Sequence, residues 1–167
     1  GKINIKLDRV KLSDVLEGIL SFTKESTRKH EFTVDIAPDL PDALADKDKF
    51  IQVVGNLLNN AVKYSPNGGR ITLSARSDEG RHQIVVSVAD EGMGISPEDE
   101  SLLFTTFHRI QRPETQGIRG SGLGLYIAKE WTEAMGGKIW LESKLNKGST
   151  FFIEIPTIDS DKISKGP

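Results

Sequence analysis

Hydrophobic side chains recur along much of the chain at the spacing of helices that bury one face. Between Leu12 and Lys29, apolar residues follow one another at intervals of three and four, and we expect Ser13 to cap this first helix. A second helix should begin near Asp46 or Asp48, because the same period resumes there after a stretch that contains prolines. Its expected buried stripe consists of Phe50, Val53, Val54, Leu57, Leu58 and Ala61.

Alternating apolar and polar positions between and after these helices predict strands. The first of them follows the first helix, the next two flank a turn at 78–81 and form a hairpin, and the last two form a closing hairpin. A third helix should begin near Ser121 and end at Gly136, ahead of the closing hairpin. This mixture predicts an α/β or α+β fold. The expected strands cover residues 31–36, 70–77, 82–89, 138–143 and 149–155.

Residues 91–122 interrupt this regular pattern. They are rich in Gly, Arg, Thr and Gln and contain only short apolar patches. A stretch of this length without regular structure is typical of a functional loop or lid, with a plain linker as the alternative. Residues 157–167 are polar, and we expect them to be a frayed tail.

Composition restricts the classes of protein that remain. A chain of 167 residues with 37% hydrophobic and 28% charged residues is the size of one globular domain. The net charge of -2 gives no basic excess, so we expect no nucleic-acid partner. The absence of cysteine excludes disulfides and thiolate metal sites. No apolar run approaches the roughly 20 residues that cross a bilayer, and the start without Met indicates a piece of a longer protein.

Two segments carry polar groups suited to a nucleotide. Asn56, Asn60 and Lys63 project from adjacent turns of one helix face, where amide oxygens and an ammonium group could meet a metal-bound polyphosphate. A solvated polar face is the alternative. Asp90 stands at the end of a strand and is followed by Gly92 and Gly94, which let the backbone approach a planar ligand while the acid accepts a hydrogen bond. A simple turn is the alternative.

Two further segments lie in the irregular stretch. Residues 104–109 hold two aromatic residues three apart, Phe104 and Phe107, followed by Arg109, which could contact a phosphate. A small hydrophobic cluster is the alternative. Residues 120–125 place glycines at every second position where a helix opens, and free backbone amides there favour a phosphate. The P-loop and the dinucleotide-binding signature are both absent, because their glycine spacing is not met.

Taken in their order and separation, these four segments resemble the N, G1, F and G2 boxes of the catalytic ATP-binding domain of sensor histidine kinases. The resemblance implies a Bergerat-type two-layer α/β (α+β) sandwich, in which a mixed, mostly antiparallel sheet packs on three helices. It implies a flexible ATP lid at about 104–120, a catalytic domain over residues 1–156 and a polar tail over 157–167.

The same resemblance implies a role for each matching residue. Asn60 would coordinate Mg²⁺, Asn56 and Lys63 would support the phosphates, Arg109 would reach the terminal phosphate, and Tyr64 would pack on the base or ribose. Asn56, Lys63 and Arg109 are thus the expected catalytic residues. The other residues expected to bind ATP are Asp90, Gly92, Gly94, Ile95, Gly120, Ser121, Gly122, Leu123, Gly124 and Leu125, with Thr150 near the adenine.

In the full-length protein, such a domain transfers the γ-phosphate of MgATP to a histidine on a separate dimerisation domain, and a response regulator receives it. The resemblance thus implies a cytoplasmic domain of a homodimeric parent that can be membrane-anchored. His30, His82 and His108 all lie outside any acceptor motif, so the chain should not phosphorylate itself. Asn56 stands where ATP-hydrolysing relatives carry a glutamate base, which argues against rapid hydrolysis. The alternative is a degenerate module that senses nucleotide without phosphotransfer.

Overall fold

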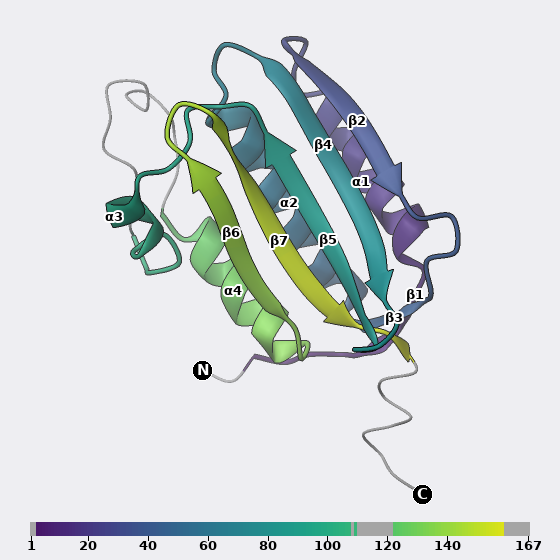
Figure 1. Ribbon diagram of the computed structural model, residues 1–167. Coiled ribbons are helices and arrows are strands. Elements are labelled where there is room, and N and C mark those ends of the chain that lie inside the picture. The colour runs from purple at the N-terminus through teal and green to yellow at the C-terminus, as the bar shows by residue number, and fades with distance from the viewer. Residues whose placement is uncertain (1–2, 108, 110–121, 159–167) are drawn as a thin grey trace, which may run out of the picture.

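The computed structural model describes residues 3–107, 109 and 122–158, and it arranges them in two layers, with one face of a sheet covered by helices (Figure 1). This confirms the predicted sandwich. The strands are β1 (Asp8–Val10), β2 (His30–Ile36), β3 (Ala43–Ala45), β4 (Gly69–Asp78), β5 (Gln83–Asp90), β6 (Lys138–Lys144) and β7 (Gly148–Pro156). The helices are α1 (Leu12–Lys24), α2 (Lys47–Lys63), α3 (Pro97–Glu100) and α4 (Gly124–Ala134).

The main sheet has the strand order β2-β4-β5-β7-β6. Only β2 and β4 run parallel, joined through the chain that contains α2, while β4–β5, β5–β7 and β7–β6 are antiparallel. A parallel pair needs such a crossover, whereas the two predicted hairpins need only short turns. In this register Asp90, the last residue of β5, lies opposite Ser149 near the start of β7.

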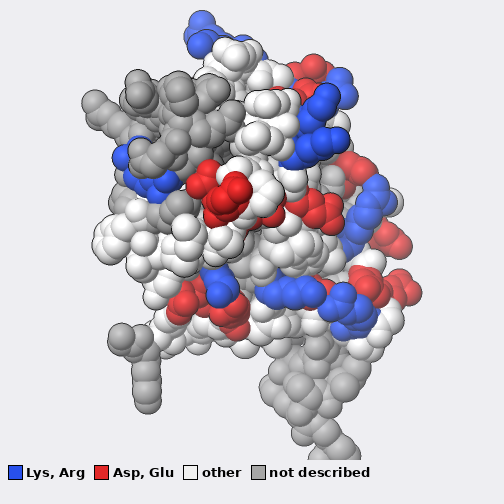
Figure 2. Space-filling view, turned by 60° about the vertical axis from the view of Figure 1, so that its left-hand side comes forward, with Lys and Arg blue, Asp and Glu red and all other residues white. Residues whose placement is uncertain are grey.

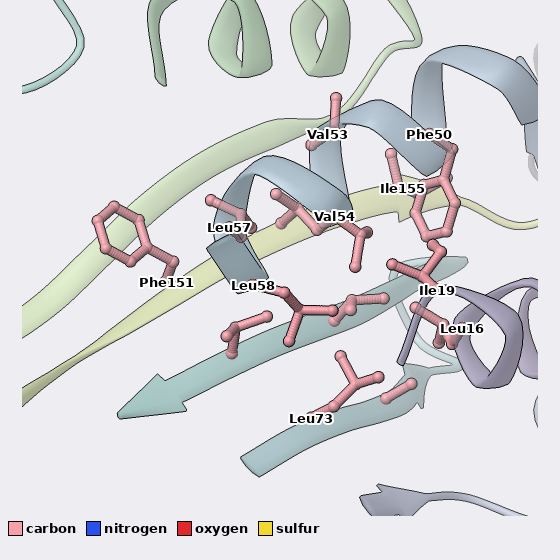
Figure 3. Close-up of a cluster of buried hydrophobic side chains, with 14 of the residues drawn as sticks. Leu16, Ile19, Phe50, Val53, Val54, Leu57, Leu58, Leu73, Phe151 and Ile155 are labelled. Carbon is pink, nitrogen blue, oxygen red and sulfur yellow. The ribbon is translucent and has the colours of Figure 1, made fainter. Parts of the chain in front are cut away.

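The core lies between the helices and one face of the sheet. All six residues of the predicted α2 stripe are buried, and they meet side chains of α1 and of the central strands (Figure 3). Burial of this apolar area is the main source of the stability of a sandwich. The core ties α2 firmly to the sheet, so the polar residues on its remaining face are held in place.

Some predicted boundaries were wrong. Helix α1 ends at Lys24 instead of Lys29, and its N-cap is Lys11, with no side-chain cap from Ser13. The predicted start of α2 is confirmed, because the Asp46 side chain accepts a hydrogen bond from Lys49 N at 3.2 Å. Helix α4 begins at Gly124, and Ser121 lies outside the described residues.

Three short elements were missed. Strands β1 and β3 form a separate two-stranded antiparallel sheet, and α3 lies within the stretch expected to be irregular. Helix α3 starts where the pattern permits it, with Ser96 as the cap and Pro97 as the first residue. Elements of three or four residues are too short to show a period.

The C-terminal boundary also shifts. Thr157 N donates to His82 O at 2.9 Å and Ile158 N donates to Asp42 O at 3.0 Å, so these two residues belong to the folded body. The rest of the predicted tail lies outside the described residues. Among the described helices, none combines the length and the apolar character that a membrane span requires.

Candidate functional site

A pocket opens where the end of α2, the end of β5, the start of β7 and the loop after β5 meet. It brings together residues that are up to 91 positions apart in the chain and that come from all four motif segments or their flanks. They are Asn60, Tyr64, Asp90, Gly94, Ile95, Leu103, Leu125, Ser149 and Phe151. The walls are mostly apolar with a few polar groups, which is the usual character of a small-molecule site.

Helix α2 holds its polar face toward this pocket. Asn56 Nδ2 donates a hydrogen bond to Gly124 O at 3.2 Å, which joins α2 to the first residue of α4. One turn later Asn60 lines the pocket. Lys63 is exposed at the end of the helix and Tyr64, its C-cap, is half-buried against the pocket. These polar side chains therefore lie along α2 at the intervals of three and four residues that the sequence predicts.

Asp90 is the most perturbed acid of the site. Burial raises its pKa to about 6, even though Oδ1 accepts hydrogen bonds from Gly92 N at 2.9 Å and from Ser149 N at 3.3 Å, which lower it. The charge of the nearby His30 also lowers it slightly. The two backbone donors fix the carboxyl group at the edge of the pocket.

The loop after Asp90 can be formed only with glycine at two places. A Cβ atom at Gly92 would overlap the carbonyl oxygen of Tyr64, and a Cβ at Gly94, whose φ is +70°, would overlap that of Lys144. The loop is fastened on both sides, because Met93 N donates to Tyr64 O at 3.0 Å and Met93 O accepts from Asn146 N at 2.7 Å. It therefore joins α2 to the β6–β7 turn.

Of the predicted lid segment, only residues 104–107 and 109 are described. Phe104 packs edge-to-face on Phe151, which lines the pocket, with ring centroids 6.4 Å apart, whereas Phe107 is exposed, so only one of the two aromatic residues joins a hydrophobic cluster. Phe107 N donates to Gly122 O at 3.0 Å, and a Cβ atom at Gly122 would lie 2.7 Å from the Phe107 backbone. Gly120 and Ser121 lie outside the described residues, while Leu123 lies just ahead of α4.

Arg109 is exposed, and its positive charge acts on Tyr64. Burial raises the pKa of the Tyr64 hydroxyl, and the charge of Arg109 opposes this rise. The structure thus places the arginine near the tyrosine that was expected to contact base or ribose. This brings the F segment to the side of the pocket on which α2 ends.

Thr150 is not brought to the pocket. Its neighbours Ser149 and Phe151 line it instead, because side chains alternate along β7 and only one of two adjacent residues can face the same side. Ser149, Phe151 and Leu103 were missed as site residues. In the sequence, the apolar residues Phe151, Ile153 and Ile155 alternate and share a face with position 149, but the apolar Phe152 on the opposite face makes this signal ambiguous.

The histidine at the start of β2 is held by two partners. His30 Nε2 donates to Ser65 O at 2.8 Å, and Nδ1 lies 2.7 Å from Thr27 Oγ1. Both ring nitrogens are therefore engaged in the chain's own contacts. This agrees with the sequence-based view that His30 is not a phosphate acceptor.

Charged side chains of both signs lie on the face drawn in Figure 2. Lys and Arg (blue) and Asp and Glu (red) are interspersed there. Charge attraction of a single sign does not dominate this face.

Comparison with known proteins finds one matching family and relatives that are sensor kinases. Residues 45–159 match the family described as histidine kinase-, DNA gyrase B-, and HSP90-like ATPase. The chain is 41% identical over 127 residues to the sensor histidine kinase WalK of Bacillus subtilis (strain 168), which covers 74% of this chain and 21% of WalK. It is 36% identical over 130 residues to the adaptive-response sensory kinase SasA of Synechococcus elongatus, which covers 78% of this chain and 33% of SasA.

Solved structures show the same fold. The mycobacterial sensor histidine kinase MprB matches with a TM-score of 0.78 and 26% identity over 91% of this chain and 98% of that one. Full-length ShkA in complex with AMPPNP matches with a TM-score of 0.80 and 28% identity over 94% of this chain and 33% of that one. The chain thus spans between a fifth and a third of the length of the two curated relatives described.

Proposed function

Because the chain belongs to the family of histidine kinase-, DNA gyrase B- and HSP90-like ATPases, we propose that it is the catalytic ATP-binding domain of a sensor histidine kinase. In the full-length protein, this domain holds MgATP and presents its γ-phosphate to a histidine on a separate dimerisation domain. A response regulator then receives the phosphate. The proposal extends to a homodimeric parent and to a cytoplasmic position of the domain.

The observation that carries this proposal is the half-buried carboxyl group of Asp90. It stands at the edge of an otherwise apolar pocket, and its orientation is fixed by the backbone N–H groups of Gly92 and Ser149. A fixed acceptor of this kind is suited to the exocyclic amine of a planar base. The apolar walls, which include Ile95 and Phe151, would take up the faces of the purine.

The residues present also suit magnesium that arrives with a polyphosphate. Among the described residues, no group of three or more His, Cys, Asp or Glu could hold a metal ion by itself. Asn60 offers one amide oxygen at the pocket, and Mg²⁺ typically takes its other ligands from water and phosphate oxygens. The bound ion would neutralise phosphate charge, while Lys63 and Arg109 supply positive charge from the protein.

The chain's own residues favour holding ATP over hydrolysing it. The Asn56 amide donates a hydrogen bond to Gly124 O, and an amide cannot remove a proton from water. The acceptor histidine and the base must therefore come from elsewhere. This domain would contribute by positioning ATP and by neutralising the charge of its phosphates.

We would test nucleotide binding by calorimetric titration of the chain with ADP and with a non-hydrolysable ATP analogue, each with and without Mg²⁺. We expect micromolar binding that weakens when Mg²⁺ is removed or in Asn60→Ala, because both remove a contact between metal and protein. Asn59→Ala is a matched control, since Asn59 is an exposed neighbour that does not line this pocket.

Absence of binding at millimolar nucleotide would contradict the proposal and leave a degenerate domain. Binding without phosphotransfer to a separately prepared histidine-bearing domain would favour the nucleotide-sensing alternative. Turnover of ATP by the chain alone at more than about one per minute would instead indicate an ATPase, since such rates lie within the range of ordinary enzymes.

A further inference from the structure

Ser143 lies on β6, outside the four motifs, and its hydroxyl group joins two walls of the pocket. Its Oγ accepts a hydrogen bond from Ile95 N at 2.8 Å and lies 3.1 Å from Gly148 O. It also lies 2.7 Å from the Oγ of Ser149. Ile95 and Ser149 both line the pocket, so one half-buried hydroxyl contacts the loop after β5 and the start of β7.

The three contacts determine which hydroxyl donates to the other. A serine hydroxyl has one proton and two acceptor lone pairs. Ile95 N can only donate, so it uses one lone pair of Ser143, and Gly148 O can only accept, so it takes the single proton of Ser143. The remaining lone pair of Ser143 must receive the proton of Ser149.

The Ser149 hydroxyl therefore has no proton left for the pocket and can act there only as an acceptor. Asp90 lies directly opposite Ser149 in the register of β5 and β7. As a carboxylate it too can only accept hydrogen bonds. The polar edge of the pocket at these two residues thus presents acceptors side by side.

On the basis of the proposed function, we propose that Ser143 is a positioning residue that orients the Ser149 hydroxyl, so that this edge selects a base with an exocyclic amine. The 6-amino group of adenine carries two N–H donors, which suits two neighbouring acceptors. Without Ser143, the Ser149 hydroxyl could rotate and turn its proton toward the ligand or toward Asp90. The preference for an amine would then weaken.

The test compares binding of ADP with binding of the 5′-diphosphate of purine riboside, which lacks the 6-amino group. The wild-type chain should prefer ADP. Ser143→Ala should lower the ratio of the two affinities about three- to tenfold, as expected for one hydrogen bond. Ser143→Thr keeps the hydroxyl in a side chain that suits a strand, and it should restore the ratio.

A double-mutant cycle separates this role from a general structural one. In a Ser149→Ala background, Ser143→Ala should change the ratio no further, because the residue through which Ser143 acts is gone. Ser87→Ala is the matched control, because Ser87 lies in β5 of the same sheet and does not line the pocket. It should leave the ratio unchanged.

Amide hydrogen exchange of the nucleotide-free chain gives a second readout. In Ser143→Ala the Ile95 amide loses its acceptor and should exchange at least tenfold faster, while the amides of β4 and β5 stay protected. Faster exchange throughout the sheet, an unchanged affinity ratio in Ser143→Ala, or additive effects in the double mutant would each overturn the inference. A wild-type chain that binds neither nucleotide would overturn the proposed function, and the inference with it.

Discussion

Asp90 shows that a residue suited to binding can be unfavourable for folding. Its folded pKa of about 6 lies above the ordinary value of 3.8, chiefly because burial penalises the charged form. The unfolded chain loses this proton near pH 4 and the folded chain only near pH 6. Stability therefore falls between these values as pH rises, and the cost of the buried charge is present in full above pH 6.

We expect Asp90→Asn to stabilise the fold and to weaken nucleotide binding. Asparagine keeps an oxygen for the two backbone donors but carries no charge, so the free energy of unfolding at pH 7.5 should rise by about 1–3 kcal/mol. Urea denaturation at pH 7.5 and pH 4 measures this, with no gain expected at pH 4. ADP affinity should fall at least tenfold. A variant that binds as tightly as wild type would contradict the assignment of Asp90 to the base.

The same carboxyl group makes binding depend on pH. Only the carboxylate accepts a hydrogen bond through both oxygens, so ADP affinity should be constant above about pH 6 and fall about tenfold per pH unit below it. Titrations between pH 5 and 8 would show this. The residual binding of Asp90→Asn should be flat over the same range, and a parallel fall in the variant would assign the titration to another group.

Single residues also show where sequence reasoning reaches its limit. Motif order and helix period single out Asn60, Asp90 and Ile95 in the sequence, and all three line the pocket. Thr150 and Ser149 could not be distinguished in the same way. In a strand, a shift of one residue exchanges the two faces of the sheet, and only the pairing with β5 fixes which residue faces the pocket.

At the scale of elements, one side chain secures the start of the helix that carries the site. Asp46 caps α2 and also accepts a hydrogen bond from Lys6 N at 3.0 Å, which ties the N-terminal segment to the helix. Burial would raise its pKa, but these backbone donors and the charge of Lys49 outweigh burial and hold it below the ordinary value.

Asp46→Ala should lower the free energy of unfolding by about 1–2 kcal/mol at pH 7, the usual cost of losing an N-cap. Because the folded pKa is lowered, the contribution is present in full above the ordinary value of 3.8 and is lost as pH falls below it, through the lower folded pKa. Chemical denaturation at pH 7 and pH 3 tests both parts. Asp48→Ala is the control, since Asp48 lies in the first turn without capping it. Equal losses in the two variants would argue against the cap.

The length of an element governs how well it is predicted. Helix α2 and strands β4 and β5 are long enough to show their periods and were recognised almost to the residue. The three-residue strands β1 and β3 pair with each other across the fold, and Ala43 of β3 also pairs with Thr157. Such pairing is a property of tertiary structure and leaves no local signal.

At the scale of the whole molecule, the sandwich supplies only part of the phosphotransfer reaction that we propose. The pocket lies at one end of the sandwich, where α2 and β5 end and β7 begins, and both ring nitrogens of His30 are engaged elsewhere. In the proposed function, the described fold holds the nucleotide and does not offer His30 as its acceptor. The proposed transfer therefore requires a second domain that approaches the pocket.

The chain alone should therefore bind ATP without becoming labelled. After incubation with γ-labelled ATP, we expect no acid-labile phosphate on the chain and clear label on an added histidine-bearing dimerisation domain. His30→Gln is the control for the one histidine that is held by two partners, and it should behave as wild type. Acid-labile label on the chain alone that disappears in His30→Gln would contradict this division of roles.

The hydrogen bond between Phe107 N and Gly122 O joins the chain where it leaves the sandwich to the chain where it returns. This hydrogen bond holds Phe107 and Gly122 next to each other. When the two ends of a connection are held in this way, the entropy cost of closing it grows only with the logarithm of its length. The fold can accept inserts of different length and sequence at this position, so a segment taken from another protein could be exchanged here while α2 and the sheet keep their form.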